Sequence, residues 1–345
     1  MTPAQVAEAF DYQSKACTAL DSPFMGQLMA LFATRDWPAG AIRDRVFAWP
    51  GDLGPRAQSV PLRLAGALHA LHLQGHDGLA AVYPPQSPSD DTLWDAVCAA
   101  MTTDAAFIDD WINSPPQTNE VRRSATLIPL GHLLADRFGL PIRTSELGAS
   151  GGLNLHWDAY ALDIDGQVFG PATPALTLHP AWSGPLPARS RPQIASRAGV
   201  DLNPLDPAQD ALRLQAYLWP DQPQRMALTR AAIAAAATKV DRGDAIDWLT
   251  PRMGHVAGEL HLIYTTIAWQ YFAADKQATG TRMIEAAGAT ATDKSPLAWF
   301  GMENDGGANG AALTLRLWPG DITITLGRAD FHGRWVEWQA ENLCE

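Results

Sequence analysis

A glycine-rich turn between a short strand and a helix is the feature that most constrains the fold of this chain. It lies in the segment Pro141-Ile-Arg-Thr-Ser-Glu-Leu-Gly-Ala-Ser-Gly-Gly-Leu-Asn-Leu155. Glycine lets the backbone approach a ligand closely, and a helix that opens after such a turn presents unpaired N–H groups to it. The segment therefore predicts a nucleotide-binding cradle at the end of a strand.

Three chemistries fit this turn, and the sequence leaves them open. Read as Glu146-x-Gly148-x-Ser150-x-Gly152, it resembles the first motif of S-adenosylmethionine (SAM) dependent methyltransferases, with serine at the middle glycine. Read from Gly148 to Gly152, it is the G-x-S-x-G string of a serine nucleophile elbow. A dinucleotide fingerprint, G-x-G-x-x-G, fits least well, because Ser150 and Leu153 replace its second and third glycines.

The composition excludes several classes of protein. The chain has 345 residues, of which 47% are hydrophobic and 18% charged, so it can bury a large core and is long enough for two domains. A formal charge of −12 gives no basic footprint for nucleic acid or anionic membranes, and we expect a small-molecule or protein partner. Its few cysteines are far apart, and the N-terminus carries acids and no long apolar run. We therefore expect a cytoplasmic protein without disulfides, signal peptide or membrane span; the oligomeric state is left open.

The spacing of apolar residues divides the chain near residue 140. Before that point, apolar residues recur at helical intervals, which predicts an all-helical N-terminal domain over residues 1–140. Its last helix, residues 118–138, is expected to kink at Pro129 and to end at Gly139.

After Gly139, strands alternate with helices, which is the pattern of a mostly parallel sheet covered on both faces. This predicts an α/β domain over residues 141–345, with an insertion at about 160–192 that carries a hairpin at Asp165-Gly166. We expect strands near 142–147, 196–201, 237–241, 260–266, 297–302, 312–317 and 322–327. We expect helices after the glycine-rich turn and near 207–217, 223–236, 244–250 and 275–288. Trp318-Pro-Gly-Asp321 is expected to be a tight turn between the last two of these strands.

Several side chains at strand ends match positions that hold SAM in methyltransferases, and that resemblance implies their roles. Glu146, with Gly148, Ser150 and Gly152, would hold the methionine end of the cofactor. Asp201, at the end of the next strand, would accept the ribose hydroxyls. Glu146 and Asp201 are separated by far more than the roughly 20 residues of a minimal strand–helix–strand unit. The assignment of Asp201 to the ribose therefore requires the insertion at about 160–192. A structural alternative for Asp201 is an Asx-turn cap before the following Asn-Pro.

The later strand ends complete the expected site. Asp244 is placed to accept the adenine amino group while the N–H of Ala245 serves a ring nitrogen, and Asp244 is equally suited to cap a helix. Thr265 ends the strand that faces the transferable methyl group in this fold. Trp269 and Tyr271 either line an acceptor pocket or are core aromatics at a helix start. No Asp/Asn-Pro-Pro-Tyr string is present, which disfavours methylation of nucleic-acid bases.

A polar segment precedes the cradle. Asn119 and Glu120 are placed to cap the pocket, and Arg122 to hold a substrate carboxylate or phosphate. The alternative is an ordinary helix N-terminus, with acids that suit the helix dipole and a solvated basic turn.

Six strings along the chain resemble a bacterial family known as domain of unknown function 2332. They are Gln117–Ser124, Glu146–Asp158, Gly199–Asp206, Leu218–Asp221, Arg242–Ala245 and Ala268–Tyr271. The resemblance runs in order across nearly the whole chain. The expected relation of this family to SAM-dependent methyltransferases rests on the Glu146, Asp201 and Asp244 positions described above. Together with the helical pattern before residue 140, it implies a Rossmann-like sheet of the SAM-methyltransferase type with an all-helical N-terminal domain. The expected function is methyl transfer from SAM to a small-molecule or protein acceptor, with no catalytic residue assigned.

Rival readings remain. A serine hydrolase would use Ser150 with Asp305 and His332, although no HGGG-type oxyanion segment is evident. A non-catalytic nucleotide-fold protein would keep the cradle only to bind a ligand. His69, His72 and His76 share the spacing of one helix face, but Gly75 interrupts that helix and no metal is expected there.

Overall fold

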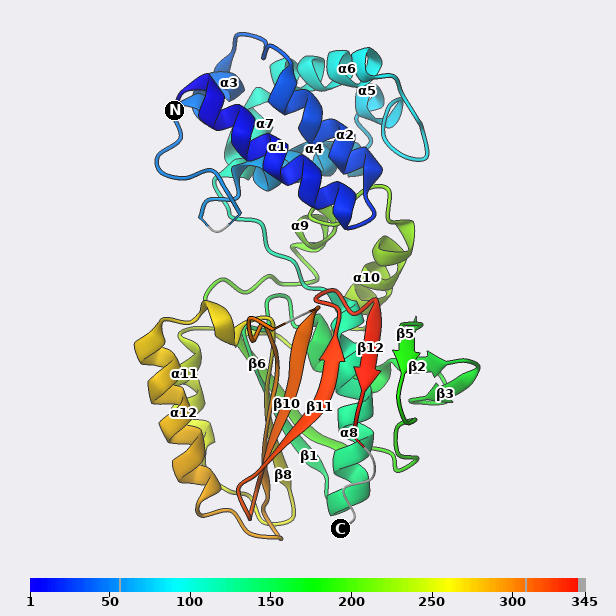
Figure 1. Cartoon of the computed structure of the whole chain (residues 1–345), viewed down its shortest axis with the longest axis vertical. Helices are drawn as coiled ribbons and strands as arrows, with labels where there is room; N and C mark the ends of the chain where they lie inside the picture. Colours follow the sequence, from blue (N-terminus) through cyan, green and yellow to red (C-terminus); the bar gives the residue numbers. More distant parts are fainter. Residues whose placement is uncertain (56, 308, 341–345) are drawn as a thin grey trace. The chain divides into compact units, whose positions relative to one another are not determined.

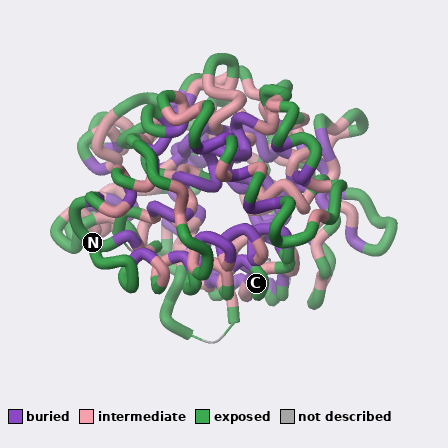
Figure 2. Tube along the Cα trace, turned by 90° about the horizontal axis from the view of Figure 1, so that it is seen from above, coloured by how far each residue is buried: buried purple, intermediate pink, exposed green. Residues whose placement is uncertain are grey.

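The chain forms two compact units in a computed structural model that describes residues 1–55, 57–307 and 309–340. The helical unit consists of Met1–Thr118 and Asp210–Ala227, leaving out residue 56. The sheet unit consists of Asn119–Gln209 and the described residues from Leu228 onward. Figure 2 shows buried stretches of the trace inside and exposed turns outside. None of the helices in the described ranges has the length and apolar character needed to cross a membrane.

The helical unit is built on a shared apolar core. Its helices are α1 (Pro3–Ala19), α2 (Pro23–Thr34), α3 (Ala41–Phe47), α4 (Val60–Leu73), α5 (Asp77–Ala80), α6 (Asp90–Thr103), α7 (Ala105–Ile112) and α9 (Ala211–Ala216). The core takes residues from all of them, and Phe10 and Leu68 are fully buried in it.

Segment 210–227 returns to the helical unit from the middle of the chain. The Asp221 carboxylate accepts the backbone N–H of Phe24 at 2.9 Å, and His69 Nδ1 lies 3.1 Å from the carbonyl oxygen of Ala216. Tyr217 packs in the same core. The observed boundary at Thr118 and this returning segment differ from the expected single division near residue 140, because both depend on contacts between residues far apart in the sequence.

The sheet unit carries the strands. They are β1 (Ile142–Leu147), β2 (Ala161–Ile164), β3 (Gln167–Phe169), β4 (Thr177–Leu178), β5 (Ala181–Ser183), β6 (Ile194–Asp201), β7 (Asp241–Arg242), β8 (Leu260–Thr266), β9 (Leu297–Glu303), β10 (Ala311–Trp318), β11 (Ile322–Ala329) and β12 (Trp335–Trp338). Its helical segments are η1 (Val121–Arg123), α8 (Ser124–Phe138), η2 (Leu153–Ala159), α11 (Ala245–Leu249), η3 (Thr250–Arg252), η4 (Trp269–Tyr271) and α12 (Ala274–Gly288). Helix α10 (Pro223–Ala235) runs across the sequence boundary between the units.

The described strands form a nine-stranded sheet in the order β5-β12-β11-β10-β9-β8-β1-β6-β7. Strand β1 pairs in parallel with β6 on one side and with β8 on the other, and β7 and β9 extend these parallel pairs. Strands β9 to β12 continue as an antiparallel meander. After β1, the chain thus forms β6 and β7 on one side of β1. It later forms β8 and β9 on the other side. This reversal of strand order beside β1 is a topological switch point, where open α/β sheets bind ligands at the carboxyl ends of their strands.

Helices cover both faces of the sheet, as expected for a mixed α/β fold (Figure 1). Alternate residues of a strand point to opposite faces. Leu262 and Tyr264 of β8 therefore pack on the face of α8, whereas Ile263 packs with Leu249 of α11 and Ile284 of α12. This core places α8 in the sheet unit. Helix α8 continues through Pro129 and ends at Gly139 in the left-handed conformation.

The expected strands are found, with local differences. The hairpin at Asp165-Gly166 joins β2 and β3 of a separate three-stranded sheet in the insertion, and the turn after Trp318 joins β10 and β11. In place of the strand expected at 237–241, the structure has only the short strand β7. The N–H groups of Ala237 and Thr238 donate to His156 Nε2, at 3.2 and 3.3 Å, and so do not pair with a neighbouring strand. The helix expected after the glycine-rich turn is the 3-10 segment η2, which has non-helical dihedral angles at His156.

Candidate functional site

The glycine-rich turn follows β1 at the switch point and is held by the end of β6. The N–H groups of Gly148 and Ala149 donate to the carbonyl oxygen of Val200 at 2.9 and 3.0 Å. Gly148 and Gly152 have φ of +76° and +72°, which L side chains rarely adopt. A Cβ on Gly148 would also lie 2.5 Å from Cβ of Ala268. The turn therefore requires glycine at both positions.

Asp201 lies at the carboxyl end of β6 and joins this strand to the turn. Its Oδ2 accepts the backbone N–H of Ser150 at 2.9 Å, and its Oδ1 accepts the N–H of Asn203 at 2.8 Å. The second bond is the expected Asx-turn cap. A carboxylate has about four lone-pair sites, so two stay available for a ligand. The next residue, Leu202, is 74% exposed and gives this strand end an apolar surface.

Glu146 is buried beneath the turn, on the face of the sheet that α8 covers. Its Oε2 lies 3.2 Å from the hydroxyl of Tyr264, which is also 3.3 Å from the carbonyl oxygen of Asn154. Burial raises the pKa of Glu146 to about 8, against the lowering effects of the Tyr264 hydrogen bond and of Arg123. Burial thus favours the neutral carboxylic acid form of Glu146.

A buried polar network ties the segment before α8 to the turn. Asn119 Oδ1 accepts the N–H of Leu153 at 2.9 Å. Asn154 donates to the carbonyl oxygen of Glu120 at 3.1 Å and accepts the Ser124 hydroxyl at 2.7 Å. Asn119 therefore supports the backbone of the cradle, whereas the sequence led us to expect that it caps the pocket. The sequence reasoning missed Ser124, Asn154 and Tyr264, which have no signature of their own.

The two arginines of the same segment have partners in the protein. Arg122 Nε lies 3.1 Å from Oε1 of Glu120, whose side chain is 3% exposed, so Arg122 is the counter-ion of a buried carboxylate. Arg123 donates to the carbonyl oxygens of Thr266 and Phe331, both at 3.0 Å. It thereby joins the ends of β8 and β11 to α8.

Asp244 caps helix α11, which is one of the two roles that we expect for it from the sequence. Its Oδ1 accepts the N–H groups of Ile246 and Asp247 at 2.9 and 3.1 Å, and its Oδ2 lies 3.2 Å from Lys276 Nζ. Partial burial would raise the pKa of Asp244, but these hydrogen bonds outweigh it and lower the pKa. Ala245 is the first residue of α11.

The loop after β8 is held by a carboxylate that the sequence reasoning missed. Glu303, at the end of β9, accepts the N–H groups of Ala268 and Trp269 at 3.1 Å and that of Gln270 at 3.4 Å. Burial raises the pKa of Glu303, although these backbone hydrogen bonds and one from Thr265 lower it. Ile267 has φ of +55°, an outlier for a β-branched residue that only a tightly held loop maintains.

Two aromatic residues of this loop have different environments. Trp269 packs edge-on against Trp299, with 5.3 Å between ring centroids, and joins the core on the α12 face. Trp269 is therefore a core aromatic, which is one of the two roles that the sequence left open. Tyr271 is 75% exposed and lies at the surface of the same loop.

Comparison with known proteins supplies the family. The family model described as "Uncharacterized protein conserved in bacteria (DUF2332)" matches residues 7–338. The chain belongs to this family. No curated protein and no solved structure matches it.

The hydrolase reading requires Ser150, Asp305 and His332 to form a triad, and in this DUF2332 member two of them, Asp305 and His332, make other contacts. Ser150 Oγ is buried without a hydrogen-bond partner among the described residues. Both carboxylate oxygens of Asp305 accept from Arg328, at 2.9 and 3.0 Å. The backbone N–H of His332 donates to Asp330 at 3.0 Å.

The histidines of the helical unit do not form a metal centre. His69 and His72 stack in α4, whereas His76 lies beyond the end of that helix and caps α5. No cluster of three or more His, Cys, Asp or Glu side chains suited to a metal occurs in the described ranges.

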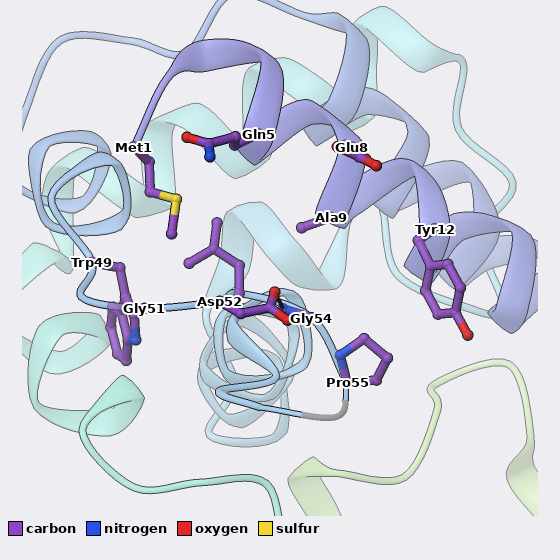
Figure 3. Close-up of a pocket in the computed structure, with 11 residues that line it drawn as sticks. Met1, Gln5, Glu8, Ala9, Tyr12, Trp49, Gly51, Asp52, Gly54 and Pro55 are labelled. Atoms are coloured by element: carbon purple, nitrogen blue, oxygen red, sulfur yellow. Dashed lines mark hydrogen bonds between the residues drawn. The ribbon is translucent and has the colours of Figure 1, made fainter.

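A cavity of about 750 Å³ opens in the helical unit, between α1 and the segment 49–55 (Figure 3). Glu8, Tyr12 and Asp52 contribute to its wall. None of the residues expected at the SAM site lines this cavity.

Proposed function

We propose that the sheet unit binds SAM at the carboxyl ends of β1, β6 and β8 and directs its methyl group to a small-molecule or protein acceptor. The observation that carries the proposal is the 2.9 Å hydrogen bond between Asp201 and the backbone of Ser150. It holds an acidic strand end against a glycine-rich turn at the switch point of the sheet, the region where open α/β sheets bind ligands.

The residues of this edge fit the parts of SAM. Asp201 keeps two lone-pair sites for the ribose hydroxyls, and the exposed Leu202 offers apolar area to the adenine. Asp244 and Ala245 stand at the neighbouring strand end, where they would bind the adenine edge. Gly148 and Gly152 would let the backbone approach the methionine end of SAM.

The chain's own contribution to the reaction is positioning. Bound SAM supplies an electrophilic methyl group on a sulfonium, and an already nucleophilic acceptor needs chiefly to be aligned with it. Thr265 and the loop that Glu303 holds would shape the acceptor side, with Tyr271 as its exposed aromatic. Below the turn, Asn154 and Tyr264 are buried and hydrogen-bonded.

Calorimetric titration of the full chain with SAM and S-adenosylhomocysteine, with NAD as a control, tests the proposal. We expect micromolar binding of the first two and loss of that binding in Asp201→Ala. Asp206→Ala is a matched control, because Asp206 caps a turn in the same loop by accepting the N–H of Ala208 at 2.9 Å. Equal affinity of Asp201→Ala and wild type would remove Asp201 from the site.

Failure of the wild type to bind either SAM or S-adenosylhomocysteine would refute the proposal as a whole. Labelling of Ser150 by a fluorophosphonate would then favour the hydrolase, since a strained serine in a strand-to-helix turn is shared with a nucleophile elbow. Binding of SAM without methyl transfer to any acceptor in a metabolite or protein extract would favour a non-catalytic binding protein.

A further inference from the structure

Ser150 has a backbone conformation that favours glycine. Its φ is +53°, in the left-handed region, where most residues with a Cβ are strained. Gly148 and Gly152, on either side, share positive φ values. The local backbone therefore favours glycine rather than serine at this position.

The hydroxyl of Ser150 has no structural role that we find in the fold. The residue is 7% exposed, and its Oγ has no hydrogen-bond partner in the described part of the chain. Its backbone is already held on both sides, because the N–H donates to Asp201 at 2.9 Å and the carbonyl oxygen accepts the N–H of Leu205 at 3.3 Å. A buried hydroxyl without a partner destabilises a protein, and such groups occur at sites where a ligand supplies the missing bond.

We propose that the Ser150 hydroxyl hydrogen-bonds the ribose diol of the bound nucleoside, beside Asp201, and makes the site selective for a ribonucleoside. The inference rests on the proposed function, which assigns the ribose to Asp201. The hydrogen bond from the Ser150 backbone to the Asp201 carboxylate holds the two residues next to each other. A neutral hydroxyl can serve the diol as donor or acceptor without adding charge next to the carboxylate.

The proposal predicts opposite changes in ligand affinity and in stability. Ser150→Ala removes the hydroxyl and keeps the Cβ, whereas Ser150→Gly also relieves the backbone. Both variants should bind S-adenosylhomocysteine about tenfold more weakly, the loss of one hydrogen bond. The melting temperature of the ligand-free protein should stay unchanged or rise in Ser150→Ala and rise in Ser150→Gly. Ser183→Ala, at an exposed serine of β5, is the control for a change without effect.

A second ligand identifies the part of the nucleoside that is contacted. 5′-Methylthioadenosine has the ribose and adenine but no amino-acid end, so calorimetry should show the same tenfold loss for it. A loss for S-adenosylhomocysteine alone would overturn the ribose assignment, and wild-type affinity of Ser150→Ala for both ligands would overturn the inference while the proposed function stands. If the wild type binds neither ligand, the proposed function fails and this inference fails with it.

Discussion

The hydroxyl of Tyr264 lies 3.2 Å from the carboxyl group of Glu146 and 3.3 Å from the carbonyl oxygen of Asn154. One hydroxyl proton cannot satisfy two acceptors fully. A proton on Glu146 resolves this, because the acid can then donate to Tyr264 while Tyr264 donates to Asn154. The geometry agrees with the raised pKa of about 8, which burial imposes on Glu146. Both the contacts and the burial of Glu146 thus favour its neutral form beneath the glycine-rich turn.

Glu146→Gln is expected to change the pH dependence of stability. The pKa of Glu146 is about 8 in the folded state and near its ordinary value of 4.5 when unfolded. The folded protein therefore binds the proton more tightly, and wild-type stability falls as the pH rises between these values, by about 1.4 kcal/mol per pH unit from this group. Gln mimics the neutral acid, so that component should vanish. Urea unfolding at pH 5, 6.5 and 8 measures it; equal pH slopes in wild type and variant would show that Glu146 is ionised.

Residues that act through their place at a strand end could be found from the sequence. Strands β1, β6 and β8 are parallel neighbours, and the alternation of strands with helices predicts that their ends, with Glu146, Asp201 and Thr265, lie at one edge of the sheet. Glu303 could not be found in the same way. Its role depends on the pairing of β8 with β9 and on a loop that turns back to the end of β9.

Long-range contacts also explain the missed boundary between the units. A helical pattern at 210–227 is the same in either unit, and only long-range contacts, such as those of Asp221 with Phe24 and of Ala216 with His69, assign the segment to the helical unit. Strands β5 and β12 escaped prediction for a similar reason. Each is short and is stabilised by pairing with the other, across a long separation in sequence.

Glu303→Ala is expected to destabilise the protein by about 1–3 kcal/mol, because three backbone N–H groups lose their acceptor. Thermal unfolding measures the loss, and the exposed Glu337→Ala serves as the control. Formate is small enough to replace the missing carboxylate. It should therefore raise the melting temperature of Glu303→Ala more than that of the wild type. An equal response of both proteins would contradict the role of these N–H groups as an anion-binding nest.

Gly131→Ala is expected to be more harmful than its helical position suggests. Alanine normally stabilises a helix relative to glycine by up to about 1 kcal/mol. A Cβ at this site would lie 2.2 Å from the ring of Trp157, which is fully buried, so overpacking costs about 1–3 kcal/mol or more. Gly139→Ala is the comparison, since a Cβ there meets nothing within 4 Å and only the positive φ opposes it. Urea unfolding should find Gly131→Ala the less stable variant; the reverse order would show that α8 can shift away from Trp157.

Gly148 and Ala268 form a pair whose contribution a double-mutant cycle can separate. Gly148→Ala adds two penalties, the positive φ of +76° and a contact of 2.5 Å with Cβ of Ala268. Ala268→Gly removes the methyl group that causes the contact and leaves the φ penalty in place. We expect Gly148→Ala to lower stability by about 2–4 kcal/mol, the sum of strain and overpacking.

Addition of Ala268→Gly should restore part of this loss, with a coupling energy of at least about 1 kcal/mol in urea unfolding. Additive effects would mean that the two loops are not in contact and can move independently. The result matters for the proposed site because this contact joins the turn after β1 to the loop after β8, and Glu303 holds the second loop. If the coupling is found, the turn after β1 and the loop after β8 form one rigid edge, and under the proposed function we expect a change in the loop after β8 to alter SAM affinity.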